Sequence, residues 1–497
     1  MQPRTQPRIW NVLVEVLLEA FMEYRPPGPA RWLSAAWIAL LFLAGSVGWT
    51  YFLNRGVIDF SRHDWAEVTA HRYAFLQDAV STGALPLHMP GAWALRNVTD
   101  RFVSVADTNL SPHVYLLRFV ELGQFFLINT LLLYAAGFLG LLLLRRRFQL
   151  SAFAFSLLLV LLFFGGSIAV HISVGHANWA SYFLVPYFVY LIFEGIDGPR
   201  HPWRWVLYLS IYLLAIVTQG AFHLFVASVF LCGLVALAYP GRAGLFLRGM
   251  VFSLLLSAIR LLPPVLNTAD FDTAFLSGFT TVGELLESLV RLVPPRSDLV
   301  SASSRIGPLG WWELDYFVGV LGLVYIVIFG TYWWTRGKPP TMAYRRLLLP
   351  VAVMTAFTVG RMFNLLHLLQ VPLLSSQRVS SRMFYLPLTV VVVLATVGLQ
   401  QFVEKRKANG AVAIALTAGA VVLCWDLWQH FALWRVANMK DLFESTPIDL
   451  SLDVVANHTD WPYFLMLGLG LVISLGTGLV LAYLVWKERV RRVAGGG

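Results

Sequence analysis

Residues 31–53 read RWLSAAWIALLFLAGSVGWTYFL, an apolar run whose one charged residue, Arg31, stands at its first position. A helix needs about 20 mainly apolar residues to cross a bilayer, so this run is long enough to stay in a membrane. Comparable runs occupy residues 119–144, 150–171, 178–196, 203–219, 221–239, 247–266, 313–334, 347–365, 383–402, 410–432 and 462–486. The sequence therefore predicts an all-α, polytopic membrane protein with about twelve transmembrane helices.

The composition agrees with this prediction. Of the 497 residues, 58% are hydrophobic and only 13% are charged, whereas a soluble domain carries roughly 25% charged residues. The mean hydropathy is +0.68. The net charge is +10, but the basic residues form short clusters between apolar runs. We therefore expect membrane lipids as partners and no nucleic acid.

The positions of the basic residues predict the orientation of the chain. Clusters occur in the N-terminal region, at Arg145–Arg147, at Arg200 and Arg204, at Arg242 and Arg248, at Arg336–Arg346, at Lys405–Lys407 and in the C-terminal tail. These are alternate connections, and most acidic residues lie in the others. Since cytoplasmic loops are enriched in Lys and Arg, both ends are predicted to be cytoplasmic in a bacterial inner membrane. Three longer loops, residues 54–118, 267–312 and 433–461, are then extracytoplasmic.

The chain divides into three predicted parts. Residues 1–30 include an apolar stripe with helical spacing, at 8–24, that predicts a cytoplasmic interfacial helix. Its acidic face leaves a protein partner open as an alternative to lipid. Residues 31–402 form the transmembrane core, and residues 403–497 add C-terminal helices and a basic tail. Cys232 and Cys424 lie inside apolar runs, which favours small core residues over a disulfide or a metal site.

The loop of residues 54–118 holds two acidic candidates. A loop this long is often functional, and helical spacing at 66–82 predicts an ordered surface helix. Asp64 follows His63 shortly after the first span, where a carboxylate can act as a general base toward a hydroxyl. Asp107 lies at the far end of the loop, where the chain returns to the membrane. Its carboxylate can therefore approach that of Asp64. The alternative for Asp64 is a solvated loop aspartate without a chemical role. The alternative for Asp107 is a helix N-cap.

Basic and polar candidates lie near the ends of other spans. Arg378 and Arg382 are four residues apart, on one helix face. Because Arg binds phosphate through a planar fork, the pair predicts an anion site, with ordinary headgroup contact as the alternative. Single polar residues at predicted outer span ends are His176, His223, Arg260, Glu313 and Tyr316. Each of these side chains is also compatible with a purely structural role, in which its polar atoms are hydrogen-bonded within the protein.

Taken in order, these features resemble the GT-C superfamily of membrane glycosyltransferases, in particular its bacterial YfhO-like branch. The resemblance covers roughly residues 31–402. It rests on Asp64-Trp65, Gly83-Ala84-Leu85-Pro86-Leu87, Ser111-Pro112, Gly175-His176, Pro186, Arg260-Leu261-Leu262-Pro263, Trp311-Trp312-Glu313, Tyr316, Gly319 and the Arg378/Arg382 pair. The resemblance implies a GT-C-like fold with a long first extracytoplasmic loop.

The resemblance also implies an activity and roles for residues. Members transfer a sugar from a polyprenyl-phosphate carrier to an envelope acceptor on the outer face, with inversion. Asp64 maps onto the general base, and Asp107 is expected to position the acceptor or share that role. Arg378 and Arg382 are expected to bind the donor phosphate, with Arg260 and His176 in reserve. His63, Glu313 and Tyr316 are assigned to the acceptor or to support of the site.

Two departures keep other functions open. His88-Met89-Pro90 follows the Pro-Leu pair where related sequences have tryptophan and asparagine, and no large soluble domain follows the core. A noncatalytic, GT-C-like structural subunit is therefore one alternative, and a transporter or flippase for a lipid-linked substrate is another. The sequence has no Walker loop, no dinucleotide fingerprint and no haem or iron–sulfur pattern. The sequence therefore gives no certain cofactor and no metal-ligand residues, and a role for a divalent metal stays open.

Overall fold

The structure, a computed structural model, describes residues 21–24, 30–90, 100–267, 278–294, 300–301, 309–336, 342–360, 362–368, 377–406 and 410–494. Most of the predicted stripe at 8–24 lies outside the described residues. Helices dominate the described chain. They are joined by loops that include one short antiparallel ladder, β1 (Val300–Ser301) with β2 (Leu309–Gly310).

Within the described chain, 7 helices are long and apolar enough to cross a membrane. They are α2 (Ala30–Phe52), α4 (Leu122–Phe148), α5 with α6 (Ala152–Phe163, Gly166–Ser173), η5 with α7 (Ala177–Leu184, Val185–Asp197), η10 with α18 (Ser380–Phe384, Tyr385–Arg406), α19 (Gly410–Leu433) and α20 (Trp461–Ala494). Each coincides with a predicted span. These helices and the composition identify a helical membrane protein.

The other predicted spans are shorter or interrupted. They are α8 (Pro202–Thr218), α9 (Phe222–Ala238), α10 with α11 (Ala243–Leu256, Ala258–Leu261), α13 with α14 (Gly319–Tyr325, Trp333–Arg336) and α16 (Leu348–Thr358). A π-helical segment, η9 (Ile326–Tyr332), separates α13 from α14. The chain bends by 117° between α9 and the helical segment that contains α10. The lengths of these helices do not by themselves establish a span count of twelve.

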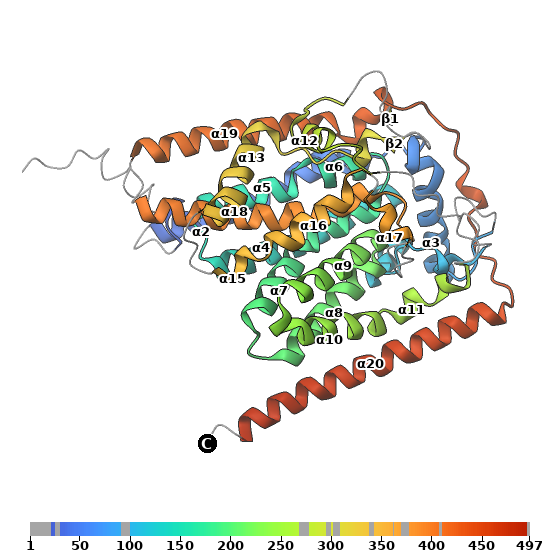
Figure 1. The fold of residues 1–497 in the computed structure, drawn as a ribbon. Coiled ribbons are helices and arrows are strands. Elements are labelled where there is room, and N and C mark those ends of the chain that lie inside the picture. Colours follow the sequence, from blue (N-terminus) through green and yellow to red (C-terminus); the bar gives the residue numbers. More distant parts are fainter. Residues whose placement is uncertain are drawn as a thin grey trace, which may run out of the picture.

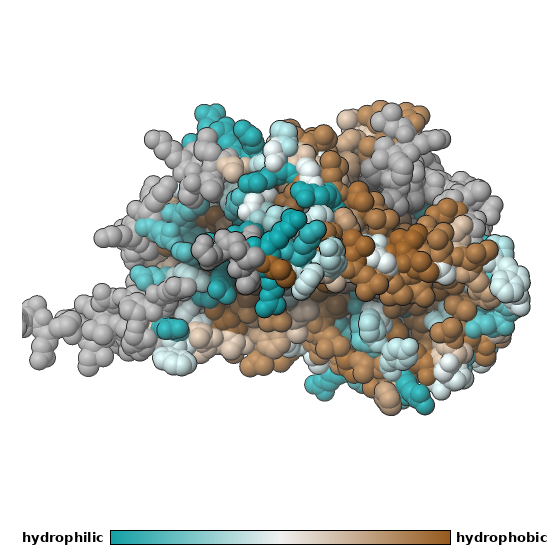
Figure 2. Space-filling view, turned by 90° about the horizontal axis from the view of Figure 1, so that it is seen from below, coloured by the Kyte–Doolittle hydropathy of each residue, from teal (hydrophilic) through white to brown (hydrophobic). Residues whose placement is uncertain are grey.

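Most of the long helices lie side by side along roughly one direction, with α18 in the middle and α20 at the periphery, whereas α3 runs across them at one end (Figure 1). In α18 83% of the apolar window is buried, against 17% in α19 and 22% in α20. Large apolar side chains such as Trp32, Leu237 and Leu479 are exposed. Figure 2 shows a wide hydrophobic surface on the face seen from below. Extensive apolar exposure of this kind suits contact with lipid.

The long loops gather at one end of the helices, which we call the loop end (Figure 1). There η2 (Trp65–Thr69) and α3 (Ala70–Thr82) form the helix predicted at 66–82. Trp65, Phe75 and Phe102 share a buried cluster with the start of α4, so the described part of the first long loop, residues 54–90 and 100–118, is ordered. The remaining short elements are η1 (Asn54–Gly56), η3 (Phe102–Ser104), η4 (Pro112–Arg118), η6 (Pro240–Arg242), η7 (Pro263–Asn267), α12 (Val282–Val290), η8 (Trp311–Glu313), α15 (Met342–Arg345), α17 (Asn364–Leu368), η11 (Val436–Asp441) and η12 (Leu450–Leu452).

Residues 443–460, which we call the strap, connect the end of α19 to α20 along the first long loop (Figure 1). Their contacts follow the order of the loop residues: Thr446 N to Ser61 O (2.8 Å), Asp453 with His71, Val455 N to Asp78 Oδ2 (2.9 Å), Asn457 Nδ2 to Leu85 O (2.7 Å), His458 to Asp100 (2.6 Å) and Asp460 to Arg101 (2.6 Å). The strap therefore joins distant parts of the sequence at the loop end.

Candidate functional site

Asp64 is positioned by the turn between α6 and η5. The indole Nε1 of Trp65 donates to Ser173 O (3.0 Å), and Thr69 Oγ1 donates to Gly175 O (2.5 Å). Gly175 has φ +107°, and a Cβ there would collide with the backbone of Asp64 and Trp65. Glycine adopts this left-handed conformation without steric cost, so it permits the close approach.

A chain of side chains leads from Asp64 into the protein. Asp64 Oδ2 lies 2.5 Å from His176 Nε2, and His176 Nδ1 lies 2.8 Å from His171 Nδ1. Burial raises the pKa of Asp64, but the hydrogen bond and positive charge of His176 outweigh it and hold that pKa at about 2. Asp64 is thus ionised at neutral pH and only accepts, which requires His176 to donate through Nε2.

Asp64 remains accessible on its other side. Its side chain is 24% exposed, and Oδ1 lies 3.6 Å from His63 Nδ1. The backbone of His63 has φ +45°, a left-handed conformation that is uncommon for residues other than glycine. Because the Asp64 carboxylate is partly exposed, a hydroxyl group can reach it. Unusual backbone conformations such as that of His63 are frequent at functional sites.

Arg382 supplies a positive charge nearby, on a side chain that is 16% exposed. Its guanidinium forms a two-point ion pair with Glu313, with Nε donating over 2.7 Å, and its Nη1 donates to His223 Nε2 over 2.6 Å. His223 therefore donates through Nδ1 to Gln377 Oε1 (2.6 Å). Burial raises the pKa of Glu313, but the charge of Arg382 outweighs it and lowers that pKa. The charge of Arg382 also lowers the pKa of Asp64.

Glu313 links the chain that begins at Asp64 to the Arg382 guanidinium, so that they form one site. Its carboxylate and the ring nitrogens of His171 and His176 all lie within 4.8 Å of one another. Tyr316 supports the same segment, because its hydroxyl donates to Ser381 O (2.7 Å) while Ser381 Oγ donates to Glu313 O (2.7 Å). We call the following residues the Asp64 cluster: Asp64, His171, His176, His223, Glu313 and Arg382. Two histidines and a glutamate in this geometry are also a possible metal-ligand set.

Asp107 lies beside this cluster and has its own partner. Its carboxylate is 2.5 Å from the Arg72 guanidinium. Burial raises the pKa of Asp107, but the charge of Arg72 and the hydrogen bond that it donates outweigh burial and lower that pKa. Gly220, with φ +83°, packs against the Asp107 carbonyl as Gly175 packs against Asp64. Each acidic residue thus rests on a glycine turn between two helices.

Arg260 and Arg378 do not contact the Asp64 cluster through any side-chain interaction of the described residues. Arg260 is buried and donates to the carbonyls of Val103 (2.6 Å), Val105 (3.0 Å) and Thr108 (3.2 Å). It therefore holds the backbone on both sides of Asp107. Arg378 is partly buried, and its Nε has no hydrogen-bond partner.

Sequence reasoning named His176, Glu313, Tyr316 and Arg382, which the structure brings together. The sequence did not indicate His171 or Arg72 as residues of the site. It indicated His223 as a polar residue near a span end but assigned it no role. His171 and His223 lie inside predicted spans, so a polar residue within an apolar run was the available signal. Arg72 had no comparable signal, because a charged residue in a loop is ordinary.

No protein-family model matches the chain, and no curated protein is significantly similar to it in sequence. The chemical capacity of the site therefore follows from its geometry. An ionised, accessible carboxylate can accept a proton or orient a hydroxyl, and an adjacent buried guanidinium can stabilise negative charge.

Proposed function

We propose that the protein transfers a sugar from a polyprenyl-phosphate carrier to a hydroxyl of an envelope acceptor. One observation supports this most directly: accessible, ionised Asp64 shares a polar cluster with Arg382 at the ends of apolar helices. A site at that level suits a donor whose isoprenoid chain stays in the bilayer. The resemblance to GT-C glycosyltransferases provides the choice of donor.

In the proposed reaction, Asp64 accepts the proton of the acceptor hydroxyl as its oxygen attacks the anomeric carbon. The bond between that carbon and the phosphate oxygen breaks, and polyprenyl phosphate leaves with inversion. A base with a pKa of about 2 is weak. A bound donor phosphate would offset the positive charge that lowers this pKa, so donor binding would strengthen the base.

The donor phosphate is assigned to Arg382. In the structure Glu313 occupies the guanidinium fork, so phosphate would displace Glu313 or share the guanidinium with it. Arg378 precedes Arg382 by four residues and has an Nε without a hydrogen-bond partner. It is assigned to the outer side of the phosphate. Asp107, held by Arg72, is assigned to the acceptor.

The proposed topology has twelve crossings with both ends in the cytoplasm. Helix α8 has 17 residues, which at about 1.5 Å per residue is nearly the thickness of the hydrocarbon core. The interrupted helices could cross as composite spans. The basic clusters at Arg145–Arg147 and Arg242 lie at the ends of α4 and α9 away from the loop end, which supports a cytoplasmic location for that end.

Native mass spectrometry of the purified full chain tests this function. The protein is loaded with undecaprenyl phosphate or with phosphatidylglycerol, an anionic lipid of different headgroup. We expect preferential retention of undecaprenyl phosphate and its loss in Arg382→Gln. Arg291→Gln is the matched control, since Arg291 also pairs with a glutamate, Glu287, outside the Asp64 cluster. Equal retention of both lipids in all three proteins would refute the phosphate site.

A noncatalytic structural subunit is the second candidate. The observation that favours it is the internal pairing of the cluster. Glu313 and His223 bond all three nitrogens of the Arg382 guanidinium, and both ring nitrogens of His176 are also bonded. Such a cluster can serve to fix helices together. This candidate predicts that Arg382→Gln lowers stability while no polyprenyl phosphate binds to the native chain.

A further inference from the structure

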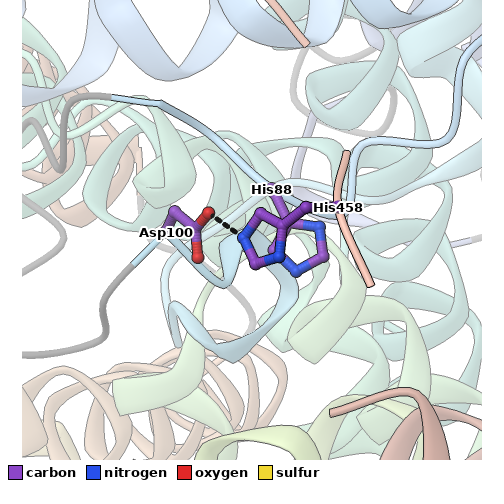
Figure 3. A group of neighbouring side chains, drawn as sticks. All are labelled: His88, Asp100 and His458. Atoms are coloured by element: carbon purple, nitrogen blue, oxygen red, sulfur yellow. Dashed lines mark hydrogen bonds and ion pairs between the residues drawn. The ribbon is translucent and has the colours of Figure 1, made fainter. Parts of the chain in front are cut away.

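A second group of potential ligands lies at the loop end, outside the Asp64 cluster. It consists of His88 and Asp100 from the first long loop and His458 from the strap (Figure 3). His88 and Arg101 form an isolated bridge that brings the two loop segments together. The backbone amide of His88 donates to Asn457 Oδ1 (3.0 Å), which aligns the strap with them.

His88 shows the clearest sign of a missing partner. Its side chain is fully buried, and neither ring nitrogen has a hydrogen-bond partner. Burying an unpaired polar group is costly, so buried side-chain nitrogens in folded proteins are usually bonded. The ring of His458 lies beside it, with centroids 4.1 Å apart (Figure 3).

The ligand atoms of the three residues lie within 4.8 Å of one another. His458 Nε2 is already 2.6 Å from Asp100 Oδ2, so a cation would replace the hydrogen that now joins them. In a tetrahedral zinc site each ligand lies about 2.0–2.2 Å from the ion, and therefore about 3.4 Å from the next ligand. Binding thus requires the His458–Asp100 pair to open slightly and any wider pair to close. The side chains of His458 and Asp100 are 54% and 30% exposed, so an ion can enter from solvent.

We propose that His88, Asp100 and His458 bind one divalent transition-metal ion of the zinc type. Two imidazoles and one carboxylate suit such an ion, whereas magnesium and calcium prefer oxygen ligands alone. Asp460 is 3.8 Å from His88 Nε2 but pairs with Arg101. The fourth position is therefore assigned to water.

The consequence of binding is structural. The ion would link His458 of the strap to His88 and Asp100, which lie in two segments of the first long loop. His458 lies immediately before α20 begins. Helix α20 packs mainly on α8, α10 and α11 and is largely exposed. The ion would thus fix the start of a peripheral helix. This inference shares no residue with the Asp64 cluster and does not depend on the proposed function.

Titration of the metal-free, full-length protein with Co²⁺, followed by visible absorption, tests the proposal. We expect a tetrahedral Co²⁺ spectrum that Zn²⁺ abolishes and Mg²⁺ does not. His458→Gln should weaken Co²⁺ binding by at least roughly tenfold. Removing a residue that only orients a metal ligand already lowers metal affinity by about this factor, and losing a ligand itself should cost at least as much. His458 is the first choice because its exposed side chain tolerates substitution, whereas His88 is buried.

Two variants distinguish this site from other histidines. His201→Gln removes a histidine at the start of α8 and should leave the spectrum unchanged. His176→Gln removes a possible ligand in the Asp64 cluster and should also preserve it. The proposal is overturned if no Co²⁺ binds, if His458→Gln titrates like the native chain, or if His176→Gln alone abolishes the spectrum.

Discussion

Gly175 lies directly against the backbone of Asp64, close enough that a Cβ would overlap it. The next residue, His176, donates the hydrogen bond that holds the Asp64 carboxylate. One turn therefore fixes both the main chain and the side chain of the proposed base. The φ of +107° at Gly175 adds a second requirement for glycine.

Gly175→Ala should destabilise the protein and displace Asp64. The φ at this position and the backbone overlap both penalise a Cβ, and strain of this kind costs about 1–3 kcal/mol. Thermal unfolding in detergent measures the effect. Gly233→Ala is the control, because a Cβ at that helical position meets nothing within 4 Å. An equal loss of thermal stability in the two variants would contradict the argument.

Asp64 should make stability depend on pH in acid. The pKa of Asp64 falls from the ordinary aspartate value of 3.8 to about 2 on folding. The resulting stabilisation is present above the unfolded pKa and is lost as pH falls from about 4 through 2. A shift of this size is worth about 2 kcal/mol. We expect the unfolding temperature of Asp64→Asn to lie below that of the native chain at pH 6 and to approach it near pH 2.

Asp59→Asn provides the comparison for this pH dependence. Asp59 is a half-exposed aspartate in the same loop, and its pKa is lowered mainly by a hydrogen bond from Ser61. Exposed pairs contribute little to stability. The pH profile of this variant should therefore follow that of the native chain. A profile like that of Asp64→Asn would instead indicate a general charge effect.

The apolar runs predicted the long helices because hydropathy is a local property of sequence. They also placed the turn between α9 and α10, after residue 239. They did not predict where η9 interrupts its helix, since a π-helical segment depends on packing. Asp64 and Arg382 were predicted by residue type and position. Their neighbours His171 and Glu313 meet only through tertiary structure, over separations that no local pattern encodes. The strap was expected only as a loop for the same reason.

Arg260 illustrates the limit of prediction by residue type. The resemblance suggested a phosphate ligand, but the structure places this guanidinium against the carbonyls of Val103, Val105 and Thr108. Arg260→Lys should lower stability by roughly 1–3 kcal/mol because buried carbonyls lose donors. Limited proteolysis should show new cleavage near residues 103–108.

Lipid binding separates the two roles of Arg260. If it serves only the loop, then Arg260→Lys protein that remains folded should retain undecaprenyl phosphate with unchanged affinity. A large loss of affinity without new proteolytic cleavage would instead assign Arg260 to the phosphate. Arg248→Lys is a matched control, because Arg248 is an exposed arginine on the preceding helix, α10.

The ion pair of Glu313 and Arg382 allows stability and ligand binding to be separated. Glu313→Gln leaves a buried guanidinium without its countercharge, which is expected to cost about 3–5 kcal/mol. The same change frees the guanidinium fork, so undecaprenyl phosphate should bind more tightly and restore part of the lost thermal stability. Arg382→Gln should be similarly destabilised, but the lipid should not rescue it.

The double variant Glu313→Leu/Arg382→Met completes the cycle. Replacing a buried ion pair by apolar residues of similar volume is often neutral or stabilising. We therefore expect this variant to unfold near the temperature of the native chain while binding no undecaprenyl phosphate. Recovery of stability without recovery of binding would mean that the pair is retained for its ligand. If Glu313→Gln instead gains no affinity for the lipid, the pair serves only to join η8 to the start of α18, as the structural-subunit function requires.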